Sequence, residues 1–184
     1  MGLYVHSIGE LPTGAERGYY IYLLDYGWEE AFGEAVRKNL PRMADVASRS
    51  DAVVIYGPRG LHFEDEVLSW HRVNGERSEE ILPALLVTTR HPATFREELG
   101  GKAKASDKDS LLLIPLKKAC QSPEEVVNMI QRVFADIRDK KELSNFRVIK
   151  EMHKGVGRAI VDAVVLEPNF SGVGFNFKKL FGIG

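Results

Sequence analysis

Short apolar segments of strand length alternate along this chain with longer segments that have the apolar spacing or the start signals of helices. The strand-like segments, rich in β-branched and aromatic residues, are residues 19–24, 51–56, 81–87, 111–114 and 159–166. Helices are predicted for residues 28–48, 63–73, 92–99 and 122–141. This alternation predicts an α/β fold, a three-layer sandwich whose mainly parallel sheet has four or five strands.

Two prolines refine the predicted helices. Pro41 lies inside residues 28–48, where it predicts either a kink or a junction between two shorter helices. Pro123 follows Ser122, and this pair is typical of a helix start, because serine can cap the first turn and proline fits within it.

A length of 184 residues fits a single domain, which we place at residues 1–184. Residues 1–18 contain turn clusters and read as a lead-in with a short edge strand at residues 3–6. Residues 168–184 form an apolar arm rich in glycine and phenylalanine. We expect this arm to pack on the domain as an extended segment or short strand, or else to contact a protein partner or a second copy of the chain.

The net charge and the lengths of the apolar segments argue against several classes of partner. The formal net charge is −1, which provides no concentrated positive field for nucleic acid or an acidic membrane. No apolar segment reaches bilayer length, so we expect neither a nucleic-acid nor a membrane partner. The first residues lack the basic flank and apolar core of a secretory signal, which predicts a cytoplasmic location. The single cysteine, Cys120, allows no internal disulfide.

Residues 50–73 are the best candidate for a functional segment, because they predict a strand, a glycine-flanked turn and a helix. In open α/β sheets, ligands bind beyond the carboxyl ends of the strands. Gly57 and Gly60 would let backbone amides approach a phosphate that Arg59 could bind. Glu66, one turn into the helix, is the candidate catalytic residue, since a carboxylate can stabilise an oxocarbenium-like ribosyl centre. Its alternative role is to complement the helix dipole.

Other polar residues follow predicted strand ends. Asp25 and Trp28 come after the strand at residues 19–24, His62 precedes the helix that carries the candidate carboxylate, and His91 follows residues 81–87. In a parallel sheet these strand ends meet at one edge, where the residues would shape a ligand pocket. The histidines lack the spacing of a helical metal motif, so we expect no bound metal, and no motif indicates a cofactor.

Residues 50–87 also resemble part of a known group of domains. The segment begins with a short stretch led by a serine. It continues with the strand Asp51-Ala-Val-Val-Ile55, a loop, a helix that carries Glu66 and the strand Ile81-Leu-Pro-Ala-Leu-Leu-Val87. This outline resembles Toll/interleukin-receptor (TIR)-like and nucleoside deoxyribosyltransferase-like domains. The resemblance implies a TIR-like or flavodoxin-like fold. It also implies that Glu66 cleaves the glycosidic bond of NAD or a nucleoside.

Two functional hypotheses follow. The first is an enzyme or sensor that holds a nucleotide-like ligand, with glycohydrolase chemistry on NAD or a nucleoside as the candidate reaction. The second is a non-catalytic protein–protein interaction module that acts through oligomerisation or through residues 168–184.

Overall fold

The computed structural model describes residues 1–12, 14, 16–27, 30–58, 62–71, 73–74, 81–92, 111–148, 164–166 and 175–176. The strands are β1 (Gly2–Tyr4), β2 (Tyr19–Leu24), β3 (Ala52–Tyr56), β4 (Val73–Asn74), β5 (Ala84–Thr88), β6 (Leu111–Pro115), β7 (Val164–Leu166) and β8 (Phe175–Asn176). The helices are α1 (Ala31–Ser48), α2 (Phe63–Trp70), α5 (Leu116–Ala119) and α6 (Pro123–Arg138), with 3-10 turns η1 (Ile8–Glu10) and η2 (Leu143–Asn145). The predicted α/β class is confirmed.

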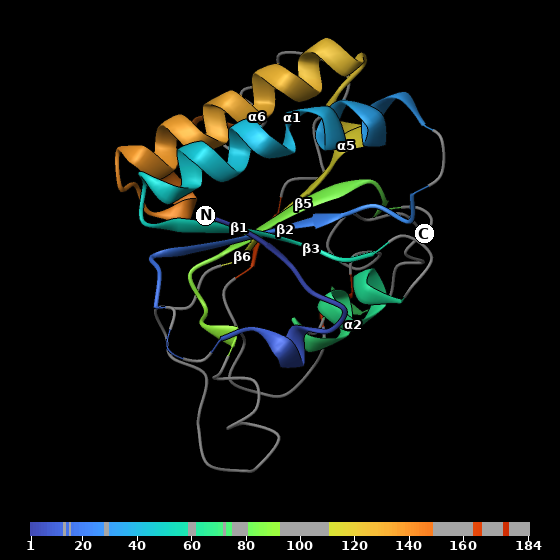
Figure 1. The fold of residues 1–184 in the computed structure, drawn as a ribbon. Helices are drawn as coiled ribbons and strands as arrows, with labels where there is room; N and C mark the ends of the chain where they lie inside the picture. Colours follow the sequence, from blue (N-terminus) through green and yellow to red (C-terminus); the bar gives the residue numbers. More distant parts are fainter. Residues whose placement is uncertain are drawn as a thin grey trace.

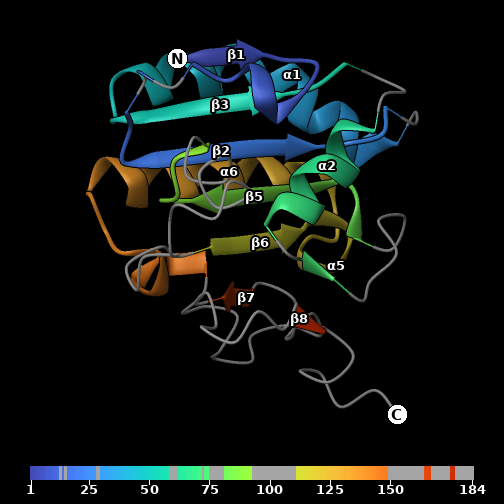
Figure 2. The same cartoon turned by 90° about the horizontal axis from the view of Figure 1, so that it is seen from below.

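Six strands form one sheet in the order β1-β3-β2-β5-β6-β7, as Figure 2 shows. Strands β1 and β2 both run parallel to β3. By contrast, β5 pairs antiparallel with β2, and each of β6 and β7 pairs antiparallel with the strand before it. The sheet is therefore mixed, and the prediction that it is mainly parallel is wrong. A wholly apolar strand shows burial on both faces, but that burial does not determine the direction in which the strand runs.

Helices cover both faces of the sheet. Figure 1 shows α1 and α6 side by side on one face and α2 on the other. The six residues of β2 are all buried, and they alternate between two apolar clusters. Odd-numbered residues such as Ile21 pack under α1 and α6, whereas even-numbered residues such as Tyr22 pack toward α2. This alternation is the two-residue period of a strand.

The helices predicted for residues 28–48, 63–73 and 122–141 are confirmed in existence and corrected in detail. Helix α1 runs without a break through Pro41, whose side chain is exposed, so one helix is present rather than two. Helix α2 ends at Trp70, three residues before the predicted end. The side chain of Ser122 accepts a hydrogen bond from the Glu125 backbone N–H at 3.3 Å, as expected of a capping residue.

The predictions for the two ends of the chain and for residues 92–99 have mixed outcomes. The first strand lies at Gly2–Tyr4 rather than at residues 3–6, and the strand expected at residues 159–166 is described only at Val164–Leu166. Apart from Pro92, the helix predicted for residues 92–99 lies outside the described residues. In the arm at residues 168–184, Phe175–Asn176 pairs in parallel with β4 as a small second sheet.

Candidate functional site

A pocket of about 270 Å³ lies beyond the carboxyl ends of β2 and β3. It is lined by Tyr4, Leu23, Asp25, Val36, Arg37, Leu40, Tyr56, Gly57, Pro58 and Glu64. We call it the β2–β3 pocket. Its walls come from β1, β2, β3, α1, the β3–α2 loop and the first turn of α2. Elements from the first seventy residues of the chain therefore meet at this pocket.

Asp25 is held at the end of β2 by its neighbours. One carboxylate oxygen accepts a hydrogen bond from the Gly27 backbone N–H at 3.1 Å, and the other forms an ion pair with Arg37 of α1. Gly27 has a φ of 80°, which favours glycine at this turn. A Cβ on Gly33 would lie 2.7 Å from the Asp25 Oδ2 atom, so the absence of a side chain there leaves room for the carboxylate.

Glu64 is the most unusual polar group of the pocket. Its side chain is buried, with 2 % of the residue exposed. The Oε1 atom accepts a long hydrogen bond of 3.4 Å from the Asp25 backbone N–H, and Oε2 has no hydrogen-bond partner among the described residues. Burial, with a smaller contribution from the Asp25 carboxylate, raises the pKa of Glu64 to about 7. At neutral pH this carboxyl is therefore ready both to donate and to accept a proton.

Two tyrosines form an aromatic wall of the pocket. Tyr4 is 52 % exposed and meets the ring of Tyr56 edge to face, with 5.1 Å between the ring centroids. The Tyr4 ring also meets the His6 ring edge to face, with 5.6 Å between the ring centroids. An exposed aromatic ring beside a cavity can pack against a planar, unsaturated part of a ligand.

Gly57 lies in the pocket wall for a packing reason. A Cβ at this position would lie 2.4 Å from Cγ of Phe63, the fully buried first residue of α2. The glycine therefore lets α2 pack closely against the end of β3, which brings Glu64 to the pocket.

Glu66 occupies a different environment. Its Oε1 atom accepts a hydrogen bond from the Ser7 hydroxyl at 2.7 Å, and Oε2 accepts one from the Ile8 backbone N–H at 3.1 Å. Both oxygens thus hold the start of η1. Glu66 is two positions after Glu64 in the helix, and a rotation of about 100° per residue turns the two side chains to nearly opposite sides of α2. The described lining of the β2–β3 pocket includes Glu64 but not Glu66.

The predicted histidines do not join the pocket. His62 is exposed at the start of α2, where its Nδ1 atom lies 3.3 Å from Asp65. His91 contacts the ring of Tyr20 edge to face at 5.4 Å. Because β5 is antiparallel to β2, its last residue Thr88 pairs with Tyr20 near the beginning of β2. The expectation that His91 lies near Asp25 is therefore wrong. Each residue follows the carboxyl end of its own strand, but these two ends lie at opposite edges of the sheet.

The remaining predicted ligand residues, Trp28, Arg59 and Gly60, lie outside the described residues. Of the predicted set, the structure brings Asp25 and Gly57 together in one pocket. Sequence reasoning missed Glu64, Arg37, Tyr4 and Tyr56. The signal that could have found Glu64 is helical phase, since a first-turn residue next to buried Phe63 faces the preceding strand end.

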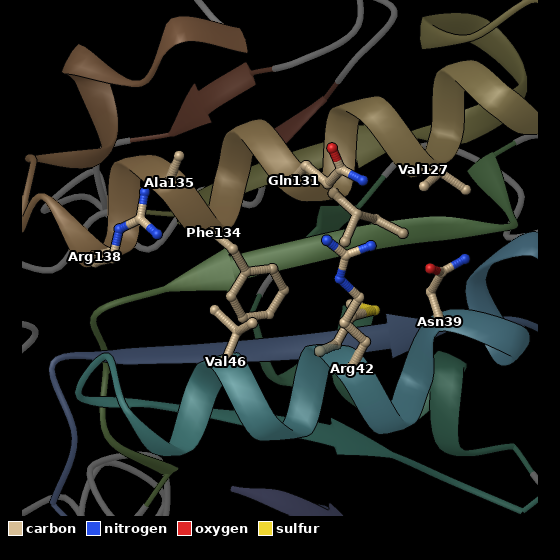
Figure 3. Close-up of a pocket in the computed structure, with 10 residues that line it drawn as sticks. Asn39, Arg42, Val46, Val127, Gln131, Phe134, Ala135 and Arg138 are labelled. Carbon is tan, nitrogen blue, oxygen red and sulfur yellow. The ribbon is translucent and has the colours of Figure 1, made fainter.

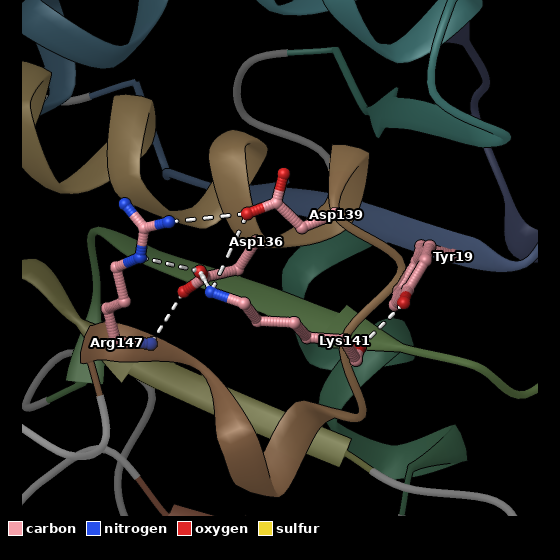
Figure 4. Close-up of polar contacts among 5 residues, drawn as sticks. All are labelled: Tyr19, Asp136, Asp139, Lys141 and Arg147. Carbon is pink, nitrogen blue, oxygen red and sulfur yellow. Dashed lines mark hydrogen bonds and ion pairs between the residues drawn. The ribbon is translucent and has the colours of Figure 1, made fainter.

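A second polar cluster, drawn in Figure 4, has a structural role. The carboxylate of Asp136 is fully buried and receives the Lys141 ammonium at 2.5 Å, the Arg147 guanidinium at 3.2 Å and the Arg147 backbone N–H at 2.5 Å. The Tyr19 hydroxyl donates to the Lys141 carbonyl at 2.6 Å. Asp136 therefore joins the end of α6 to the following segment, and the Tyr19 hydrogen bond joins that segment to β2.

Among the residues that the structure describes, no group of three histidine, cysteine or acidic side chains is arranged to hold a metal ion. Burial raises the pKa of the Cys120 thiol to about 11, which disfavours the thiolate. Within the described part of the chain, no helix has the length and apolarity required to cross a bilayer.

Comparisons with protein-family models, with curated proteins and with solved structures found no match for this chain.

Proposed function

We propose that this chain binds a nucleoside or nucleotide in the β2–β3 pocket and cleaves its N-glycosidic bond, with Glu64 as the residue that exchanges a proton with the ligand. The observation that carries the proposal is the Glu64 carboxyl itself. It is buried in a pocket wall, one of its oxygens has no partner among the described residues, and its pKa of about 7 suits acid–base chemistry at neutral pH.

The other walls support a ligand of this class. The Tyr4 and Tyr56 rings offer a surface for a planar base. The Asp25 carboxylate can accept hydrogen bonds from ribose hydroxyls, and Arg37 can attract a phosphate. A volume of about 270 Å³ favours a nucleoside or mononucleotide over a whole dinucleotide, so only part of NAD would fit inside.

In this proposal the bond between ribose C1′ and the base nitrogen breaks. The base leaves with the bonding electron pair and takes the proton of Glu64. A water molecule then adds to C1′ and returns a proton to the Glu64 carboxylate. Glu66, which the TIR-like and deoxyribosyltransferase-like resemblance implies, is the competing assignment for the catalytic carboxylate.

The test is to incubate the protein with inosine, AMP and NAD and to follow the free bases and nicotinamide by chromatography. We expect base release from inosine or AMP that slows by at least about 100-fold in Glu64→Gln, the typical contribution of a general acid. Glu66→Gln serves as the matched variant on the same helix and should retain the activity.

Each other outcome has a defined meaning. Loss of activity in Glu66→Gln alone would transfer the catalytic role to Glu66. If no base or nicotinamide is released, the enzyme proposal fails, and AMP binding measured on the same sample by calorimetry decides what remains. AMP binding without cleavage would leave a nucleotide sensor, and absence of both would reject the nucleotide ligand.

A further inference from the structure

A second cavity, of about 200 Å³, lies between α1 and α6 and shares no lining residue with the β2–β3 pocket. Figure 3 shows the two helices side by side, with Asn39 and Val127 at one end of the cavity and Val46 and Arg138 at the other. We call it the α1–α6 groove. The groove extends along α6 from Val127 to Arg138, a length of about 16 Å at the rise of an α-helix.

The floor of the α1–α6 groove is apolar and buried. Met43, Ile130 and Phe134 are at most 5 % exposed and belong to the main core of the sheet face under α1 and α6. Ala135, which is half-buried, contributes only a methyl group to the wall, so the space between the helices is left open there.

The rim of the α1–α6 groove is positively charged. Arg42 and Arg138 line it and are exposed, and no carboxylate appears among the described residues of the lining. Within the part of the chain that the structure describes, neither arginine forms an ion pair, whereas Arg49 on the same helix as Arg42 pairs with Asp45 at 2.9 Å. The chain as a whole has a net charge of −1, so this local excess of positive charge is not a property of the entire surface.

We propose that the α1–α6 groove binds an acidic segment of a partner protein, which inserts one bulky apolar side chain between the helices while its carboxylates pair with Arg42 and Arg138. A buried aromatic or aliphatic anchor with charged contacts around it is a common basis of such recognition. A second copy of this chain fits less well, because a two-fold interface would place the same arginines of both copies against each other.

A fluorescein-labelled helical peptide built from glutamate, alanine and leucine, with one central tryptophan, is the probe for this proposal. We expect saturable binding by fluorescence anisotropy, with a dissociation constant of about micromolar order. A peptide with lysine in place of every glutamate should not bind.

Variants locate the contact. The double variant Arg42→Glu with Arg138→Glu should weaken binding by at least about tenfold, because two attractive pairs become repulsive. Ala135→Trp fills the groove from within and should abolish binding without a change of charge. Arg49→Glu is the matched control: it has the same charge reversal on an exposed arginine outside the groove lining, and we expect it to bind the peptide as the wild type does.

The proposal is overturned if the acidic peptide does not bind, or if it binds equally to the double variant and to Ala135→Trp. An equal loss in Arg49→Glu would also overturn it, because the attraction would then be general rather than specific to the groove. The folding of each variant is checked by circular dichroism. None of these residues lines the β2–β3 pocket, so glycosidase activity and peptide binding can succeed or fail independently.

Discussion

At the scale of single residues, the environment of a carboxyl group decides what it can do. Glu64 and Glu66 both lie in the first turn of α2. Glu64 is buried, and one of its oxygens has no partner among the described residues, whereas both oxygens of Glu66 accept hydrogen bonds, from Ser7 and from Ile8. The first arrangement leaves a proton exchangeable with a ligand, and the second holds the amino-terminal segment in place.

A single residue, Gly57, also determines how closely α2 packs against β3. We expect Gly57→Ala to lower the free energy of unfolding by about 1–3 kcal/mol, because the added methyl group would overlap with the ring of Phe63 and push α2 away from β3. Urea denaturation followed by tryptophan fluorescence measures the change.

Gly14→Ala is the control for this variant, since no atom lies within 4 Å of a Cβ built at Gly14. Its free energy of unfolding should stay within about 0.5 kcal/mol of the wild type, as for most surface substitutions. Equal stability of Gly57→Ala and Gly14→Ala would contradict the packing role of Gly57.

At the scale of elements, the buried Asp136 carboxylate fixes where α6 ends and how the chain continues from it (Figure 4). We expect Asp136→Asn to destabilise the protein by about 2–3 kcal/mol, because the amide cannot neutralise Lys141 and Arg147. The expected loss is moderate, since both basic side chains are partly exposed and water can solvate them. The measurement is again urea denaturation.

Asp139→Asn tests whether an exposed carboxylate with the same partners contributes less to stability than the buried one. Asp139 pairs with the same Lys141 and Arg147, but its side chain is 43 % exposed. Its replacement should cost less than about 1 kcal/mol, as is typical of surface ion pairs. A larger loss in Asp139→Asn than in Asp136→Asn would show that burial of Asp136 is not the dominant factor.

Most elements could be predicted from the sequence because their signals are local. The apolar run of β3, the cap at Ser122 and the spacing of α6 each act within a few neighbouring residues. The direction of β5 is not local. Its residues are all buried, and a fully buried strand has the same composition whether it runs parallel or antiparallel to its neighbour.

In the candidate site, too, the residues marked by local sequence signals could be predicted, and those placed by tertiary packing could not. Asp25 and Gly57 could be predicted, because each ends a recognisable strand on the parallel side of the sheet. Glu64 could have been found only from its helical phase beside Phe63. Arg37 and Tyr4 could not be assigned from the sequence, because their roles depend on the packing of α1 against the sheet and on the pairing of β1 with β3.

At the scale of the whole molecule, two buried groups make opposite contributions to the dependence of stability on pH. Burial raises the pKa of Glu64 to about 7, so its contribution to stability is full below the ordinary value of 4.5 and is lost as pH rises to 7. Burial lowers the pKa of His71 to about 4, so its contribution is full above the ordinary value of 6.5 and is lost as pH falls to 4. Between these limits the two slopes oppose each other.

Glu64→Gln should reveal this opposition, because it removes one titrating group and keeps a side chain of similar shape. As pH falls from 7 to 4.5, we expect the wild type to gain stability relative to the variant by up to about 3 kcal/mol. Urea midpoints of both proteins across this pH range provide the measurement. Parallel curves for the two proteins would contradict the raised pKa of Glu64.

The pairing of β1 with β3 has a consequence for the order of assembly during synthesis. The ribosome makes Gly2–Tyr4 well before the strand that contains Val54, the pairing partner of Gly2. The β2–α1–β3 unit is contiguous in sequence and can form on its own nascent segment, whereas β1 must wait for β3 to emerge. The edge strand that carries Tyr4 therefore joins the sheet only after β3 has been made, and the aromatic wall of the β2–β3 pocket is completed after Asp25, which follows β2, has been synthesised.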